Sequence, residues 1–318
     1  MNLILLTGAG FSHNWGGWLA SEAFEYLLGR PEVDNHGRDL LWKHKDKGFE
    51  EALSELQRAG GPALLGMEAA VRAMFEDMNR GFLAGGRGFE FSNDTSNSVA
   101  RFLAKFDAIF TLNQDLLLEL GYCINEPAQA ICTRRTWSGF DFPGMRPQGP
   151  PPPMTSRFAA PWLPSDEIIR PKGALQPIYK LHGSSNWTDP EGRRLLVMGG
   201  DKTAAIGGSN VLTAYMEAFR QALETPDTRL VVIGYGFRDN HINMAIERAA
   251  DQGGLSLFVI DPAGADAPDP DYGRALVRAP GPHSRRQGAI RGASRRPLAR
   301  IFGGDTIERD KVLRFLSS

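Results

Sequence analysis

The feature that most constrains the fold is a short apolar run at residues 3–6, which ends directly in a glycine-rich turn at residues 8–10. An uninterrupted apolar run of this length is typical of a strand that is buried on both faces, as in a parallel sheet. The following segment, from about residue 12 to residue 28, is predicted to be a helix closed by a glycine and a proline. A buried strand, a glycine turn and a helix form the opening unit of an α/β fold.

The same order of elements returns later in the chain. Four more strands are predicted, at residues 107–112, 178–181, 230–233 and 255–260. Helical patterns occupy residues 211–223, 240–250 and 307–316. Strands that alternate with helices predict an α/β fold with a Rossmann-like parallel sheet and helices on both faces. In such sheets, ligands bind beyond the carboxyl ends of the strands.

Residues 38–82 interrupt this order, because their apolar residues have helical spacing with a single break at residues 60–62. We therefore predict that the chain is divided into a Rossmann-like catalytic domain of residues 1–30 and 105–275, a helical insertion of residues 31–104, and a C-terminal tail of residues 276–318 with a short helix.

Two segments have the composition of loops. Residues 143–177 contain many prolines, which predicts loop or polyproline structure and excludes a sheet interior. Residues 278–300 are rich in Arg, Gly and Pro and are expected to be mobile.

The composition disfavours several classes of protein. Lys and Arg together number 36 and Asp and Glu 37, a net charge of −1 that argues against direct binding of nucleic acid. No apolar run approaches the roughly 20 residues that a membrane helix requires. The two cysteines, Cys123 and Cys132, lack the paired spacing of a structural zinc site, so we expect no metal and a reducing, cytoplasmic environment.

The first turn is a candidate binding site for a pyrophosphate, because glycines permit a close backbone approach and a helix N-terminus attracts anions. Its residues are Gly8, Ala9, Gly10 and Ser12. The turn departs from the dinucleotide-binding fingerprint at the third glycine position, where His13 stands. An ordinary strand-to-helix turn is the alternative interpretation.

Asn113 and Asp115 follow the strand at residues 107–112. Their amide and carboxylate groups are suited to bind sugar hydroxyls, a carboxamide or a water. One of them could equally cap the next helix. The sequence favours neither interpretation.

His182 follows another predicted strand and precedes a glycine. A neutral imidazole accepts a proton at cellular pH and so is a candidate base, although a structural histidine is the commoner case. His241 follows the strand at residues 230–233, where Asp239 or Asn240 is a candidate helix cap, and we interpret it as structural. The chain contains no nucleophile elbow, no P-loop and no metalloprotease motif.

Taken in order, three segments resemble the sirtuin family: GAGFS at residues 8–12, TLNQD at residues 111–115 and LHG at residues 181–183. Two longer segments, KLHGSSNW at residues 180–187 and VIGYGFRDNHIN at residues 232–243, are similar to the bacterial sirtuin-like NADases of antiphage defence. Sirtuin deacylases carry four zinc-binding cysteines after the catalytic histidine, and this chain has none there.

The resemblance implies roles for individual residues. It implies that the pyrophosphate of NAD is held by Gly8, Ala9, Gly10 and Ser12. Asn113 would position the water or the nicotinamide ribose, and Asp115 would face the carboxamide. His182 would be the base, whereas Gly234 and Asp261 would lie at the adenosine end.

The resemblance further implies a zinc-less NAD hydrolase that releases nicotinamide and ADP-ribose and depletes NAD during antiphage defence. Its partners would be further copies of the chain or a genomically linked protein such as a helicase-like ATPase, with nucleic acid engaged only indirectly. An NAD-dependent protein deacylase and a non-catalytic module that senses NAD or ADP-ribose are the alternatives.

Overall fold

The structure is a computed structural model that describes residues 2–84, 88–92, 98–123, 137–149, 160–165, 168–267 and 289–317. The prolines at positions 150–153 and Cys132 lie outside these ranges, so the expectations placed on them stay predictions.

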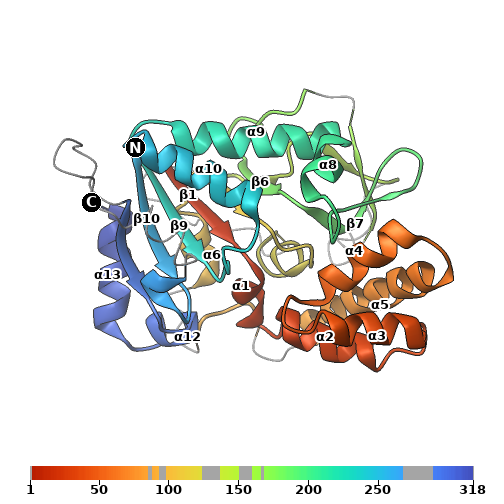
Figure 1. Cartoon of the computed structure of the whole chain (residues 1–318). Coiled ribbons are helices and arrows are strands. Elements are labelled where there is room, and N and C mark those ends of the chain that lie inside the picture. Colours follow the sequence, from red (N-terminus) through yellow and green to blue (C-terminus); the bar gives the residue numbers. More distant parts are fainter. Residues whose placement is uncertain are drawn as a thin grey trace.

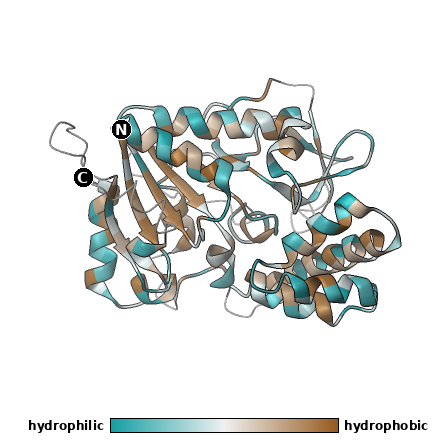
Figure 2. Cartoon of the chain, in the orientation of Figure 1, coloured by the Kyte–Doolittle hydropathy of each residue, from teal (hydrophilic) through white to brown (hydrophobic). Residues whose placement is uncertain are grey.

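A seven-stranded, fully parallel sheet forms the centre of the molecule, in the order β11-β10-β9-β1-β2-β6-β3 (Figure 1). Its strands are β1 (Asn2–Thr7), β2 (Ala108–Thr111), β3 (Phe140–Asp141), β6 (Gln176–Lys180), β9 (Thr228–Ile233), β10 (Leu255–Ile260) and β11 (Ile290–Ser294). The apolar residues of β1 are buried on both faces, as their uninterrupted run predicts, and Figure 2 shows the central strands coloured as hydrophobic. The predicted Rossmann-like α/β class is confirmed.

Helices cover both faces of this sheet. The helices of this part of the chain are α1 (Ala9–His13), α6 (Val99–Leu103), α8 (Lys202–Gly207), α9 (Asn210–Glu224), α10 (Asn240–Asp251), α12 (Leu298–Ile301) and α13 (Thr306–Ser317), of which α8 packs against α9. Phe110 of β2 packs against Phe219 of α9, and Phe258 of β10 packs against Phe315 of α13. The strand register aligns Phe258 with Ile109, so Phe258 and Phe110 point to opposite faces.

A second group of helices packs beside the sheet around a separate apolar core (Figure 1). Its members are α2 (Ala20–Leu28), α3 (Asn35–Lys43), α4 (Phe49–Ala59) and α5 (Pro62–Ala84), and we call them the helical unit. The expected break lies between α4 and α5. The helix predicted from residue 12 to residue 28 is wrong, because two glycines, one of them Gly16 with φ +90°, separate α1 from α2.

Two segments expected to be loops contain strands. The proline-rich segment supplies β4 (Met145–Pro147) and β5 (Trp162–Pro164) to a smaller sheet, whose other strands are β7 (Gly183–Thr188) and β8 (Arg194–Leu196). In the Arg- and Gly-rich segment, β11 pairs with β10, where the absent side chain of Gly292 leaves room for the ring of Phe258. Residues 290–294 are therefore part of the main sheet, contrary to the expectation of a mobile segment. Among the described helices, none combines the length and apolar composition needed to cross a bilayer.

The turns after β1 and β9 pack directly against each other. These strands are neighbours, but the chain leaves them toward opposite edges of the sheet, which makes this the switch point where α/β sheets bind ligands. Gly10 N–H donates to the carbonyl of Gly234 over 3.0 Å. Gly234 has φ +61°, and a Cβ at this position would lie 2.4 Å from the carbonyl carbon of Gly10.

We predict that Gly234→Ala destabilises the protein more than Gly253→Ala does. Both residues have positive φ, so both substitutions introduce backbone strain of about 1–2 kcal/mol. Only Gly234 faces another backbone, whereas Gly253 faces open space, so Gly234→Ala should lower the free energy of unfolding by roughly 1–3 kcal/mol more. Urea denaturation measures the difference, and equal losses would contradict the close packing of the two turns.

Candidate functional site

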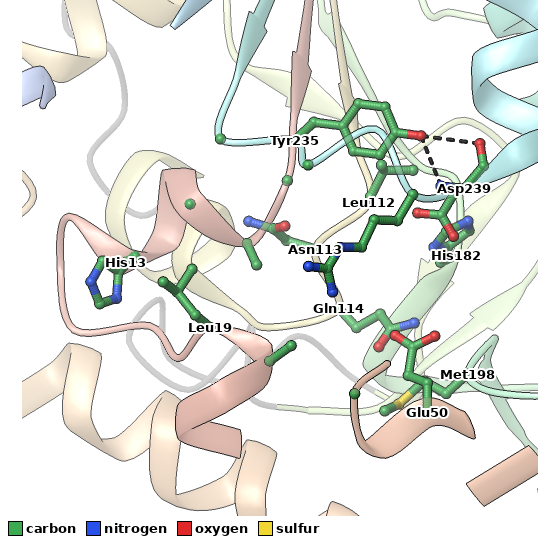
Figure 3. A pocket seen from close by; sticks show the side chains of 18 of the residues that line it. His13, Leu19, Glu50, Leu112, Asn113, Gln114, His182, Met198, Tyr235 and Asp239 are labelled. Carbon is green, nitrogen blue, oxygen red and sulfur yellow. Dashed lines mark hydrogen bonds between the residues drawn. The ribbon is translucent and has the colours of Figure 1, made fainter. Parts of the chain in front are cut away.

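A cavity of about 1540 Å³ opens at the carboxyl ends of the central strands and extends to the helical unit. Figure 3 shows part of its lining from close by. Eight of the nine residues singled out from the sequence line it: Gly8, Ala9, Gly10, Asn113, Asp115, His182, Gly234 and Asp261. On the opposite side, the helical unit contributes Phe49, Met74 and Met78, which no sequence motif indicated.

Ser12 is the ninth predicted residue, and it lies behind the cavity wall. It is 2% exposed, and its hydroxyl accepts a hydrogen bond of 2.8 Å from the amide nitrogen of Asn113. The backbone N–H of Asn113 donates to the hydroxyl of Thr111, which in turn receives a hydrogen bond from Thr7. The ends of β1 and β2 therefore hold Asn113 from both its backbone and its side chain.

The glycine turn also differs from the expected phosphate loop. Gly8 N–H donates to the carbonyl of Ile233, and Gly10 N–H donates to that of Gly234. Each hydrogen bond has a donor–acceptor distance of 3.0 Å. These two donors are engaged within the protein. The small size of both glycines serves the close contact with the β9 turn, where a Cβ on either would lie within 3 Å of backbone atoms.

Asp115 is 7% exposed, and burial raises the pKa of its carboxyl. Its Oδ1 accepts a hydrogen bond from Leu117 N–H. Beneath it, the buried ammonium of Lys180 donates to the carbonyl oxygen of Asp115 and to Oε1 of Glu119. Each of these hydrogen bonds has a donor–acceptor distance of 2.6 Å. Sequence reasoning missed this pair. The available signal was a lysine in an otherwise apolar predicted strand, together with an acid in the helical turn after the neighbouring strand.

His182 occupies the junction between β6 and β7 and is 3% exposed. Burial, which is the largest cause, acts together with the positive charge of Lys202 and the neighbouring His241 to lower its pKa to about 3, although Asp239 opposes the shift. The imidazole is therefore neutral throughout the physiological range and retains a lone pair that can accept a proton.

His241, interpreted above as structural, lines the same cavity as His182. Its Nε2 lies 3.0 Å from Nε2 of His182. Asp239 occupies the N-cap position of α10, but its side chain makes no capping hydrogen bond and instead accepts one of 2.6 Å from Lys202. The signal in the sequence was a carboxylate two residues before a histidine, placed after a central strand.

Tyr235 holds this turn in shape. Its hydroxyl accepts a hydrogen bond of 3.2 Å from the N–H of Asp239 and contacts Oδ1 of Asn243 at 2.9 Å. The amide of Asn243 donates to the carbonyl of Phe237, a residue with positive φ. Figure 3 shows the Tyr235 hydroxyl facing Asp239, with His182 beside it.

Among the described residues, the ligand-type atoms of His182, Asp239 and His241 lie within 4.8 Å of one another, a spacing that a metal ion can occupy. The ammonium of Lys202 already contacts the Asp239 carboxylate. A divalent cation would therefore meet a resident positive charge, and this donor set does not favour a metal.

The buried neutral state of His182 predicts a pH dependence of stability. Below pH 6.5 the unfolded chain binds a proton that the folded protein excludes down to about pH 3, so the free energy of unfolding falls as pH falls. Between pH 7 and pH 5 the contribution of His182 to this loss is about 2 kcal/mol. Urea denaturation of wild type and His182→Gln at both pH values should show that the difference between their free energies of unfolding changes by that amount. A difference that stays the same at both pH values would contradict the burial of His182.

The chain matches no curated protein. A family model described as a SIR2-like domain matches residues 107–279, which is more than half of the 318 residues. The matched stretch includes Asn113, Asp115, His182 and the turn after β9, all of which line the cavity described above. The chain therefore belongs to the SIR2-like domain family, whose members are generally NAD-dependent enzymes.

Proposed function

We propose that this protein hydrolyses NAD at the bond between nicotinamide and ribose. The observation that carries the proposal is the shared cavity, in which Asn113 and His182 stand together at the carboxyl ends of β2 and β6. The reaction consumes NAD and water and gives nicotinamide, ADP-ribose and a proton. NAD is the substrate, and no metal enters the chemistry.

The chemistry suits these side chains. Cleavage of the bond passes through an oxocarbenium-like ribose, as in glycoside hydrolysis. Nicotinamide leaves as a neutral pyridine, so the site needs no strong acid. Water that bonds to the cationic sugar carbon becomes strongly acidic, and a weak neutral base such as His182 suffices to take its proton. Asn113, fixed by Ser12, is placed to orient the water or the ribose.

The far end of the cavity is suited to the rest of the dinucleotide. Asp261 follows β10 and lines the cavity, where its carboxylate is suited to accept hydrogen bonds from ribose hydroxyls. Arg238, Arg295 and Arg296 also line the cavity and bring positive charge to a ligand that carries two phosphates. Because the N–H groups of Gly8 and Gly10 are engaged, we assign the binding of the pyrophosphate mainly to these cations and to Ala9.

We further propose that the enzyme depletes NAD during antiphage defence. Constant hydrolysis would kill the host, so activity is held low until the chain assembles with further copies or with a partner such as a helicase-like ATPase encoded nearby. The resemblance of the motifs to sirtuin-like NADases supports this role.

The products formed from NAD test the proposal. Wild type, with and without the product of the neighbouring gene, should release nicotinamide and ADP-ribose. Asn113→Ala and His182→Ala should lower turnover about 10²- to 10⁴-fold while NAD binding is retained, because both side chains act on the transition state. Chromatography of the products and calorimetric titration of NAD into each variant measure the two effects.

His36→Ala is the matched control, because His36 is an exposed residue of α3 that does not line the cavity. It should retain wild-type turnover. Release of acetate from an acetylated peptide would identify a deacylase instead. NAD binding without turnover under every assembly condition would identify a sensing module.

A further inference from the structure

One cation connects the helical unit to Asp239, whose carboxylate lies close to the candidate catalytic histidine. Nζ of Lys202 lies 2.7 Å from Oε2 of Glu50 and 2.6 Å from Oδ1 of Asp239. Glu50 belongs to the first turn of α4, whereas Asp239 immediately precedes α10. The Lys202 and Asp239 side chains are 21% and 16% exposed, so solvent screens their contact less than a surface ion pair, whereas the Glu50 side chain is 39% exposed.

The bridge ends near the two imidazoles, because ligand-type atoms of Asp239, His182 and His241 lie within 4.8 Å of one another. When both rings are neutral, the 3.0 Å contact between the Nε2 atoms of His182 and His241 is a hydrogen bond only if one of these nitrogens carries a proton. If His182 donates, its Nδ1 keeps the lone pair, as a base requires. His182 is more deeply buried than His241, and the centroids of the two rings lie 5.1 Å apart, so the ring of His241 limits the rotation of the His182 ring.

We propose that His241 and Asp239 are positioning residues that hold His182 as the Nε2–H tautomer, and that Glu50 and Lys202 fix them from the helical unit. This inference rests on the proposed function for its effect on turnover. It makes the helical unit part of the catalytic apparatus. A movement of α4 would break the ion pair between Glu50 and Lys202 and leave Lys202 paired with Asp239 alone. This change would disturb the geometry of both imidazole rings.

Contacts elsewhere on the same surface support a fixed placement of the helical unit. The hydroxyl of Ser54 accepts a hydrogen bond from Gly200 N–H, and Gln57 donates to the carbonyl of Met198. Both hydrogen bonds join α4 to the loop between β8 and α8. Helix α4 therefore touches the segment that presents Lys202 at several points.

The first test compares Glu50→Gln with Glu55→Gln. Both substitutions remove a carboxylate from α4 that binds a lysine, but Glu55 contacts Lys43 and His44, and none of these three residues contacts Lys202. We expect Glu50→Gln to lower kcat about 10-fold with little change in KM, and Glu55→Gln to leave both unchanged. Equal kcat values for the two variants, or a change confined to KM, would overturn the link to the helical unit.

The second test uses the conservative variant at position 241. The amide oxygen of His241→Gln can accept the hydrogen bond from His182, whereas His241→Leu cannot. A displacement of the reacting group of about 1 Å lowers turnover about 10²-fold, so His241→Leu should lose roughly that much kcat and His241→Gln should regain most of it. Equal losses in both variants would exclude positioning through this hydrogen bond.

A measurement without NAD separates this inference from the proposed function. Nitrogen-15 NMR of the free protein should show His182 as the Nε2–H tautomer in wild type, and a mixture of tautomers in His241→Leu. An Nδ1–H tautomer in wild type overturns the inference even if NAD is hydrolysed. If NAD is not hydrolysed, the proposed function fails, but the tautomer still decides whether His241 positions His182.

Discussion

The backbone contact between the turns after β1 and β9 determines the geometry of the whole site. The β1 turn carries Ser12, which holds Asn113, and the β9 turn leads to Asp239 and His241. Because Gly234 packs directly on the backbone of Gly10, the two turns have one allowed separation. Main-chain packing therefore fixes the separation between the turn that supports Asn113 and the turn that leads to His241.

Buried charges provide the second constraint. Lys180 and Glu119 are both about 2% exposed and lie under the carboxyl ends of β2 and β6. Removing one partner of such a pair leaves the other without compensation in a medium of low dielectric constant, at a cost of about 3–5 kcal/mol. Lys202 serves two carboxylates at the edge of the cavity. Fixed charges of this kind are already oriented before a ligand binds.

The sequence predicted the central sheet well, because buried parallel strands contain apolar runs: β1, β2, β9 and β10 each have a run of three or more apolar residues, and β6 has a shorter one. It failed for β4, β5 and β11, because strands of three to five residues with mixed polar and apolar composition have no clear apolar pattern; β11 lies at the sheet edge. Candidate site residues at strand ends could be found, since parallel strands bring their carboxyl ends to one edge. The sequence could not reveal that His241 and Glu50 lie close to these residues, because their placement depends on how α10 and the helical unit pack in three dimensions.

The order of the strands has a consequence for biosynthesis. Asn2 of β1 is aligned with Thr228 of β9, and Ile4 is aligned with Ala108 of β2, so the central strand finds its two neighbours only after long stretches of chain. Contacts of such large sequence separation form late and slowly. A nascent chain still on the ribosome thus has no assembled cavity until β9 has been translated, and shorter chains cannot bring the amide and both imidazoles together.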